Sequence, residues 1–314
     1  RLNKWFMKHL ERNNNNDIPA THEQRKQVKV GAVLVLYNPN LDLLQQCVDT
    51  LEQQVDEVCV VDNSTSSHSS FFCAYKQKVC YIANMKNIGI AAAQNIGIEH
   101  FKRLQFHFVL FSDQDSLSPQ GLVQGLLTAY QHLSPIIPIA CIGPMPINRT
   151  NGKPYFCPQN VLKTGQHEGV TYHQVHSIIS SYSFIPLKNF EVVGNMREQL
   201  FIDFVDDDWC WRALTYHQMV SVLVPNIRIE HELGVSSTFM GRNISLSSPF
   251  RMYYQTRNLL WMCRQPYTPT YWKRMNLKKL LIKFVYYPLF THQRWAYLKR
   301  MVQGVIDGLR TSLN

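Results

Sequence analysis

The hydrophobic positions of this chain fall into short continuous runs and longer segments with helical spacing, and the two kinds alternate. The continuous runs are rich in β-branched residues and predict strands at 28–37, 55–61, 106–111, 139–143, 175–186 and 220–224. The helical spacing predicts helices at 41–53, 87–100, 119–132 and 206–217, and residues 71–82 predict a weaker helix followed by a strand. This alternation predicts an α/β fold with a mostly parallel central sheet and helices on both faces.

Two end regions depart from the alternation. The first 27 residues contain four consecutive asparagines and many charges, so we expect a leader that is poorly ordered or loosely helical. Between strands, the pattern predicts a loop at 143–169 and a turn at 191–195. The predicted organisation is a main domain at 28–248, followed by a basic helical region at 249–314.

Positive charge is concentrated at the C-terminal end. The chain of 314 residues has a net charge of +10, and residues 251–314 hold 12 lysines and arginines against one acidic residue. Such a concentration indicates an anionic partner for this region. The basic residues accompany no base-stacking module, which argues against a nucleic-acid partner.

The segment 271–290 mixes lysines with apolar and aromatic side chains. In a helix, Leu277, Leu280, Leu281 and Phe284 would form one apolar stripe beside the lysines. We therefore expect 271–300 to lie on an anionic membrane surface, while packing of this stripe against the main domain stays open and does not exclude it. No apolar run reaches the ~18–20 residues of a membrane-spanning helix.

Cysteine usage and composition narrow the class of protein. A hydrophobic content of 45% argues against disorder, and 314 residues suffice for one large domain or two unequal ones. The eight cysteines form no Cys-x-x-Cys pair, and several lie in apolar runs. This favours reduced, buried thiols in a cytosolic protein over a disulfide framework or a zinc site.

Paired aspartates follow one of the predicted strands. Asp113 and Asp115 flank Gln114 directly after the apolar run 106–111, so both carboxylates can face one ligand. Carboxylates this close repel each other unless a cation or water separates them, and oxygen ligands suit Mg²⁺ or Mn²⁺ with substrate phosphates. The pattern indicates a metal–diphosphate site, with a solvated turn as the alternative.

Polar residues also end two other strands. Asp62 and Asn63 follow the run 55–61 and could accept from a nucleobase or form an Asx turn. Asn87 and Gly89 open a helix of small residues that includes Asn95. A helix start of this kind favours an approaching negative charge, and close helix–sheet packing explains it equally well.

A second acidic cluster, Asp206-Asp207-Asp208, opens the helix that contains Trp209. Carboxylates at a helix start stabilise it, but three in succession exceed what capping needs. One of them, held near an acceptor hydroxyl, would serve as general base. His231 follows a strand beyond this cluster, where it is either a packed residue or a metal ligand.

Taken together, these motifs resemble family 2 glycosyltransferases of the GT-A fold, and more narrowly the bacterial rhamnosyltransferases that build O-antigen or capsular polysaccharide. The matching stretches, in order along the chain, are 36–39, 60–64, 87–91, 113–116, 143–144, 200–203, 205–206, 209–210, 212–213, His231 with 233–234, Arg251 with 253–254, 257–258 and 307–308. The resemblance implies a Rossmann-like GT-A catalytic domain at 28–248, with a nucleotide-binding half at 28–116 and an acceptor half at 117–248.

Residue roles follow from the resemblance. It implies that Asp206 deprotonates the acceptor hydroxyl and that Asp115, with His231, holds Mg²⁺ or Mn²⁺. The residues expected to bind the nucleotide sugar are Tyr37, Asn38, Asp62, Asn63, Asn87, Gly89, Asn95, Asp113, Gln114 and Arg257. The residues expected to bind the acceptor are Tyr182, Asp207, Asp208, Trp209 and Asn258. The expected reaction is an inverting transfer of L-rhamnose from dTDP-L-rhamnose to an oligosaccharide or lipid-diphosphate-linked acceptor.

The resemblance also implies a place in the cell and leaves rivals open. We expect a cytoplasmic enzyme that is peripheral on the inner face of the cytoplasmic membrane, with a homodimer left open. A UDP-sugar donor, galactose or galactofuranose, is the alternative, and a catalytically silent module that binds glycan or lipid diphosphate is a further one. One departure from the pattern concerns Tyr182, which stands where glycine is usual and is expected to fill space near the sugar or acceptor.

Overall fold

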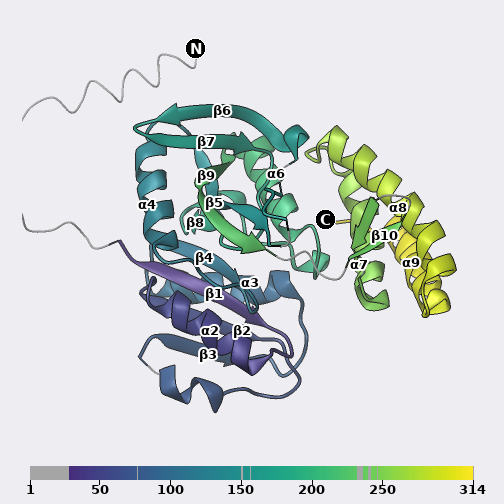
Figure 1. Cartoon of the computed structure of the whole chain (residues 1–314), viewed down its shortest axis with the longest axis horizontal. Helices are drawn as coiled ribbons and strands as arrows, with labels where there is room; N and C mark the ends of the chain where they lie inside the picture. Colours follow the sequence, from purple (N-terminus) through teal and green to yellow (C-terminus); the bar gives the residue numbers. More distant parts are fainter. Residues whose placement is uncertain are drawn as a thin grey trace, which may run out of the picture.

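The computed structural model describes residues 28–75, 77–149, 151–155, 157–231, 236–239, 242–245 and 247–313. The side chains of residues 231–246 lie outside this description. The expected leader at 1–27 falls outside it too. Figure 1 shows the described chain, with its C-terminal helices beside the sheet domain.

Nine strands among the described residues form one sheet, in the order β3-β2-β1-β4-β8-β5-β9-β7-β6. The strands are β1 (Val30–Leu36), β2 (Glu57–Asp62), β3 (Val79–Ala83), β4 (Phe108–Asp113), β5 (Ile139–Asn148), β6 (Val161–His167), β7 (Val170–Val175), β8 (Phe184–Pro186) and β9 (Val220–His231). β1 pairs in parallel with β2 and β4, and β5 pairs in parallel with β9, whereas β8 is antiparallel to both of its neighbours. β10 (Ser236–Phe239) and β11 (Arg242–Ser245) form a separate hairpin.

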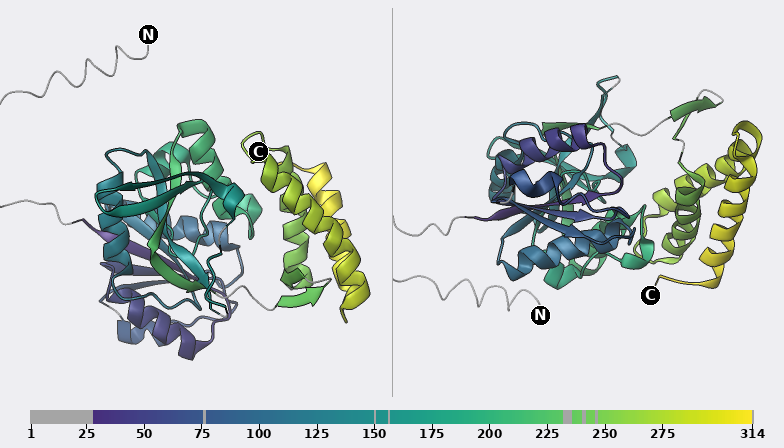
Figure 2. Two further views of the ribbon diagram at one scale, coloured as in Figure 1. Left: turned by 45° about the horizontal axis from the view of Figure 1, so that its top comes forward. Right: turned by 90° about the horizontal axis from the view of Figure 1, so that it is seen from below.

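Helices cover both faces of the sheet (Figure 2). One face carries α2 (Leu41–Glu52) and α4 (Leu122–Leu133), and the other carries α3 (Ile90–Arg103), α5 (Asn189–Val193) and α6 (Val205–His217). Alternation along β1 produces this arrangement, because Leu34 points into the α2 side while Val33 points into the α3 side. The predicted α/β class with a large central sheet and helices on both faces is confirmed. The sheet is mixed, because β1–β4 and the β5–β9 pair are parallel while β6, β7 and β8 pair antiparallel with their neighbours.

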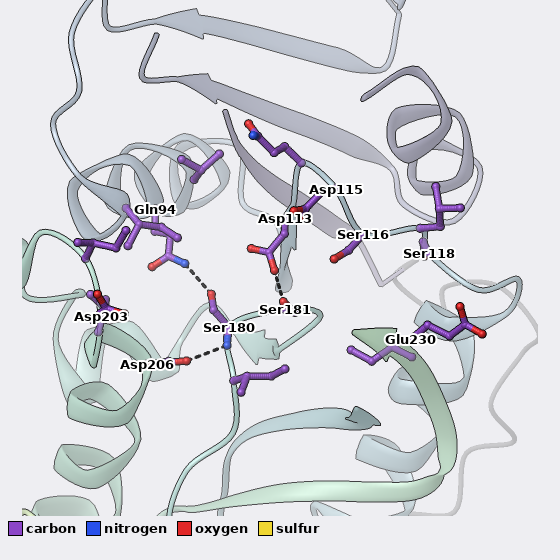
Figure 3. A pocket seen from close by; sticks show the side chains of 18 of the residues that line it. Gln94, Asp113, Asp115, Ser116, Ser118, Ser180, Ser181, Asp203, Asp206 and Glu230 are labelled. Atoms are coloured by element: carbon purple, nitrogen blue, oxygen red, sulfur yellow. Dashed lines mark hydrogen bonds between the residues drawn. The ribbon is translucent and has the colours of Figure 1, made fainter. Parts of the chain in front are cut away.

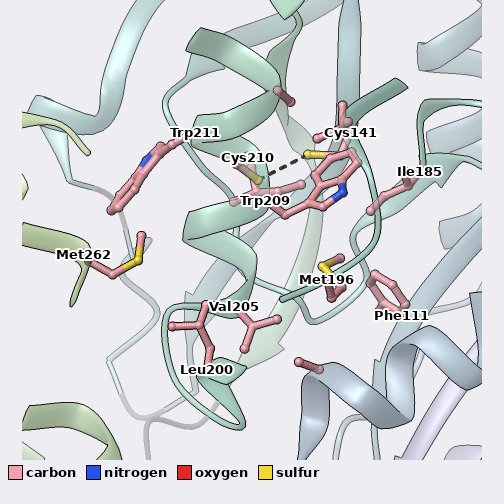
Figure 4. Close-up of a cluster of buried hydrophobic side chains, with 14 of the residues drawn as sticks. Phe111, Cys141, Ile185, Met196, Leu200, Val205, Trp209, Cys210, Trp211 and Met262 are labelled. Carbon is pink, nitrogen blue, oxygen red and sulfur yellow. Dashed lines mark hydrogen bonds between the residues drawn. The ribbon is translucent and has the colours of Figure 1, made fainter. Parts of the chain in front are cut away.

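The core on the α3 side is built from large apolar residues of the second half of the chain (Figure 4). Trp209 and Trp211 of α6 are fully buried there, and the Cys141 and Cys210 sulfurs lie 3.7 Å apart. All eight cysteines are free thiols, and Cys73 is exposed. This core fixes the start of α6 against the end of β4.

Element boundaries differ from the sequence prediction between residues 143 and 195. β6 and the extended end of β5 lie in the expected loop 143–169, and α5 replaces the expected turn. The expected strand 175–186 is confirmed only at its ends, in β7 and β8, and is wrong at 176–183, where the sheet is interrupted. The serines between β7 and β8 bond instead to aspartates. A pattern of hydrophobic residues does not predict such polar partners. The short 3₁₀ turns are η1 (Phe71–Tyr75), η2 (Pro158–Asn160) and η3 (Glu198–Leu200).

The C-terminal region consists of α7 (Pro249–Arg264), α8 (Thr270–Phe290) and α9 (Arg294–Arg310). Ser248 caps α7 by accepting from the Arg251 N–H. α9 lies tightly against α7 at Gly304, where a Cβ atom would be 2.7 Å from the carbonyl oxygen of Tyr253. Close backbone contact of this kind requires glycine.

The outer faces of α8 and α9 carry exposed apolar side chains. Leu281 and Leu289 are each 69% exposed and Trp295 is 71% exposed. The stripe expected in this segment is divided, since Leu280 is buried while Leu277 and Leu281 face outward. Among the described residues, no helix has the length and apolar character to cross a membrane.

Candidate active site

A large cleft of about 1550 Å³ opens where the main domain meets α7 (Figure 3). Its walls come from the end of β4 with the turn after it, the serine-rich segment 179–181, the loop and helix start 202–207, and α7. Ends of parallel strands gather at this edge, which is where open α/β sheets bind ligands. The two acidic clusters predicted from sequence meet in this cleft.

The first cluster sits on the turn after β4. Asp113 is the last residue of β4, and its carboxylate accepts a hydrogen bond from Ser181 Oγ. Asp115 is exposed in the cleft and, among the described residues, makes no hydrogen bond or ion pair. The Gln114 side chain bonds the Tyr37 backbone twice, at 2.8 and 3.2 Å. Gln114 therefore ties β4 to the end of β1 while both aspartates face the cleft.

The second cluster opens α6. Asp206 Oδ2 accepts from the Ser180 N–H at 3.0 Å and Oδ1 accepts from the Asp207 N–H at 3.0 Å. Burial raises the pKa of Asp206 despite these hydrogen bonds. Burial, followed by the charge of Asp206, raises the pKa of Asp207 to about 7, although Ser177 Oγ donates to its carboxylate at 2.6 Å. A carboxylate with a raised pKa is a stronger base than an ordinary aspartate.

A hydrogen-bonded chain orients the proposed base. Gln94 of α3 donates to Ser180 Oγ at 2.7 Å, and the Ser180 backbone in turn donates to Asp206. Figure 3 shows both bonds converging on Ser180. Gln94 is 3% exposed, and its Oε1 has no partner among the described residues. A buried acceptor that faces a ligand cleft is available to a substrate hydroxyl.

The loop before α6 is strained. Phe201, Asp203 and Phe204 all have positive φ, at 64°, 66° and 66°, although none is glycine. Gly89 at the start of α3 has φ 87°, and a Cβ atom there would lie 2.7 Å from Phe201. Gly89 thus allows the loop to approach α3. Strained backbone of this kind is often kept at functional sites because surrounding packing enforces it.

Several cleft residues were not predicted from sequence. Arg251 of α7 makes three hydrogen bonds, at 2.8, 3.0 and 3.1 Å, to the carboxylate of Asp203. Next to them, Lys283 donates to Gln255 Oε1 at 2.7 Å, and burial lowers its pKa to about 8. α7 therefore supplies one cationic side chain to the cleft, Arg251, whereas Lys283 of α8 lies behind the lining residue Gln255. Arg251 lay within a matched motif, but no local pattern separates it from the other arginines of this basic region.

Other predicted nucleotide-binding residues lie beside the cleft. Asp62 is 1% exposed, and burial opposes its charge, but hydrogen bonds from Ser64, His68 and Tyr81 hold its pKa below the ordinary value. Asn38 is exposed, and its backbone donates to Ser64 Oγ. These contacts order the ends of β1 and β2, and the nucleotide-binding role of Tyr37, Asn38 and Asp62 stays a prediction.

The predicted helix-start residues form an internal network. Asn63 donates to the Gly89 carbonyl at 3.0 Å, and the Gly89 N–H donates to Asn87 at 3.0 Å. Asn95 both donates to and accepts from the Met196 backbone at 2.9 Å. None of these side chains lines the cleft. The structure gives them packing roles, and a contact with the nucleotide stays a prediction.

Trp209 and Asp208, which the sequence predicts to bind the acceptor, are held inside the protein. Trp209 Nε1 donates to the Gly194 carbonyl, and Asp208 is fully buried between Arg212 and Tyr267.

Asn258 donates to the Leu200 and Ile202 carbonyls, and Arg257 stacks on Trp261 with 4.0 Å to the ring centroid. Tyr182 has φ 57°, in the region that favours glycine, and donates to the Ser116 carbonyl at 2.6 Å. Tyr182 therefore supports, from the interior of the protein, the turn that carries Asp115. The His231 side chain lies outside the described part of the structure, so its metal role stays a prediction.

The acidic turn fits a hard divalent cation. Asp113 and Asp115 provide carboxylate oxygens at the carboxyl end of β4, and Asp115 is exposed to the cleft. Oxygen donors that leave room for water and phosphate are what Mg²⁺ and Mn²⁺ require.

Known proteins are similar to this chain in sequence and in fold. Residues 32–193 match the family model for glycosyl transferase family 2. The chain is 32% identical over 291 residues to the dTDP-rhamnosyl transferase RfbF of Shigella flexneri, an alignment that covers 90% of this chain and 95% of that protein.

Two solved structures are similar at low identity. GalNAc-T7 with UDP, GalNAc and Mn²⁺ matches with a TM-score of 0.53 and 15% identity over 86% of this chain. S. aureus TarS matches with a TM-score of 0.52 and 14% identity over 88% of it. The matches cover 58% and 49% of those chains, so this chain spans about half of their length. At this identity the likeness concerns the fold.

Proposed function

The chain belongs to glycosyl transferase family 2 and has the GT-A fold, and on that premise we propose that it transfers L-rhamnose from dTDP-L-rhamnose to a hydroxyl of a growing bacterial surface glycan. The similarity to a dTDP-rhamnosyl transferase, which extends over 90% of the chain, is the observation that carries this proposal. The cleft supports it, because one base and one acidic turn face each other across it.

We propose an inverting displacement. Asp206 removes the acceptor hydroxyl proton while the acceptor oxygen bonds to the anomeric carbon and the bond from that carbon to the dTDP oxygen breaks. The raised pKa of Asp206 suits it to this proton transfer. Its two backbone hydrogen bonds orient the carboxylate. No covalent intermediate is required, because the acceptor oxygen displaces the diphosphate in one step.

The leaving diphosphate needs positive charge. We assign Asp115 and Asp113 to Mg²⁺ or Mn²⁺, which when bound would stabilise the charge that develops on the diphosphate. Arg251 lines the opposite wall and adds a cation from α7. Gln94, whose buried Oε1 has no partner among the residues described, is proposed to accept a hydrogen bond from a sugar hydroxyl.

We also propose that the enzyme acts at a membrane surface. The exposed stripe of Leu277, Leu281 and Leu289 runs beside Lys278 and Lys279 on the outer face of α8. Apolar side chains that insert between headgroups and lysines that meet anionic lipid form an interfacial helix. Such attachment suits an acceptor carried on a lipid diphosphate, and we propose that it occurs on the cytoplasmic face of the membrane.

A donor panel tests the proposal. Binding and hydrolysis of dTDP-L-rhamnose, UDP-galactose and UDP-galactofuranose would be measured with and without Mn²⁺, for the wild type and for Asp206→Asn. We expect metal-dependent preference for dTDP-L-rhamnose, with binding kept and turnover reduced about 10²-fold or more in the variant. Asp206→Asn loses one backbone hydrogen bond, so its melting temperature serves as the folding control. Preference for a UDP-sugar would refute the donor, and binding of no nucleotide sugar would refute the transferase.

A further inference from the structure

A second group of ligand-type side chains converges away from the cleft. Cys59 of β2 and Cys80 of β3 are register partners on parallel strands, so their side chains project to the same face. His100 lies at the C-terminal end of α3, which packs over that face. The Cys59 Sγ, the Cys80 Sγ and a ring nitrogen of His100 all lie within 4.8 Å of one another. Three soft or borderline donors thus converge from three elements.

The orientation of His100 suits metal ligation. Its Nε2 lies 2.5 Å from Glu57 Oε1, and its Nδ1 lies 4.0 Å from Cys80 Sγ. Donation of the Nε2 proton to the carboxylate leaves Nδ1, which lies near Cys80 Sγ, unprotonated and able to bind a metal ion. A carboxylate behind a histidine in this way is the usual support of a metal-binding imidazole, because it fixes the tautomer and raises the basicity of the ligating nitrogen.

We propose that Cys59, Cys80 and His100 form a zinc site, with water as the fourth ligand and Glu57 as the residue that positions His100. Thiolate and imidazole donors select Zn²⁺ over Mg²⁺ or Mn²⁺, so this site is chemically distinct from the acidic turn. Ligand atoms in a tetrahedral zinc site lie about 3.5–3.8 Å apart, given bonds of about 2.0–2.3 Å, so closure requires a contraction of about 1 Å at most. Cys59 is buried, while Cys80 and His100 are partly exposed, which leaves an entry path for the ion.

The site would join β2, β3 and α3 at the edge of the sheet remote from the cleft. Cys59 lies in β2 and Cys80 in β3, and no residue of either strand lines the cleft, so the site is separate from it. α3 in turn carries Gln94, which contacts Ser180 behind the proposed base. Zinc bound here would hold β2, β3 and α3 together, in the half of the domain that is proposed to bind the nucleotide. Spacing along the chain gave no hint of it, because Cys59 and Cys80 meet only through strand pairing.

Metal content tests the site directly. The full chain would be purified without a polyhistidine tag, loaded with ZnCl₂ in excess Mg²⁺, desalted, and analysed for zinc by mass spectrometry. We expect about one zinc per chain in the wild type and near-complete loss in Cys59→Ser, Cys80→Ser and His100→Gln. Cys73→Ser, which changes an exposed thiol, is the matched control and should keep the metal. Asp115→Asn should also keep it, which separates this site from the cleft and from the fate of the proposed transferase activity.

Two measurements keep the proposal falsifiable if a cysteine variant fails to fold. Titration of the wild type with Co²⁺ should give the visible bands of a tetrahedral thiolate complex, and Glu57→Gln should weaken Zn²⁺ binding about 10–100-fold with the three ligands intact. Zinc content no higher than in Cys59→Ser would overturn the proposal. A Cys59–Cys80 disulfide found by peptide mapping of anaerobically purified protein, or loss of the zinc in Asp115→Asn, would do so as well.

Discussion

Replacement of Asp207 by asparagine should make the protein less sensitive to alkaline pH. Asp207 has a pKa of about 7, raised by burial and then by the charge of Asp206. Asparagine has nearly the same shape, and its oxygen can still accept the hydrogen bond from Ser177. The substitution therefore removes a charge and changes little else.

The sign follows from proton binding. Between about pH 4 and pH 7 the folded protein keeps a proton on Asp207 that the unfolded chain has released, so the free energy of unfolding falls as pH rises. This stabilising contribution is complete below the unfolded pKa and is lost once pH passes the folded pKa of about 7. From pH 5 to pH 8 the loss spans about two pKa units, or about 2.7 kcal/mol as an upper limit. Because the side chain borders the open cleft, screening by water reduces this to about 1–2 kcal/mol.

Urea unfolding at pH 5 and pH 8 measures the effect. The stability difference between Asp207→Asn and the wild type should become more favourable to the variant by about 1–2 kcal/mol at pH 8 relative to pH 5. Asp42→Asn, which changes an exposed aspartate in the first turn of α2, is the control and should show no such pH-dependent gain. An equal effect of Asp207→Asn at both pH values, or a loss of stability at pH 8, would refute the reasoning.

Three further predictions concern the metal, the membrane and the core. Asp115→Asn should abolish the Mn²⁺ dependence of donor binding while leaving the melting temperature near that of the wild type, and titration calorimetry measures both the affinity and its metal dependence. Leu281→Glu should reduce co-sedimentation with vesicles that contain anionic lipid, while donor hydrolysis in solution stays unchanged; equal sedimentation would contradict an interfacial role for α8. Gly97→Ala should cost about 1–3 kcal/mol of stability, because a Cβ atom there would lie 2.4 Å from a methyl group of Val33. Chemical denaturation checks this value, and an unchanged midpoint would show that α3 can move away from the sheet.

The sequence alone determined the fold class and the identity of the acidic motifs. Strand and helix periods are local properties, because a strand buries alternate residues and a helix buries every third or fourth, so β1, α2 and β4 could be predicted closely. The Asp113–Asp115 and Asp206–Asp207 pairs could also be identified from the sequence. Neighbouring carboxylates repel each other and destabilise the fold unless they have a function or a compensating charge. Their meeting in one cleft depends on tertiary packing, because Asp113 ends β4 while Asp206 lies in the first turn of α6.

The tertiary structure decided which polar residues face the cleft and which are held inside. Asp207 and Asp208 are neighbours in sequence, yet one borders the cleft and the other is buried in an ion pair with Arg212, because successive helical residues point about 100° apart. Arg251 reaches the cleft only because α7 packs beside the loop that holds Asp203. Contacts between segments so far apart in the chain depend on how the elements pack, and no local pattern of residues encodes them.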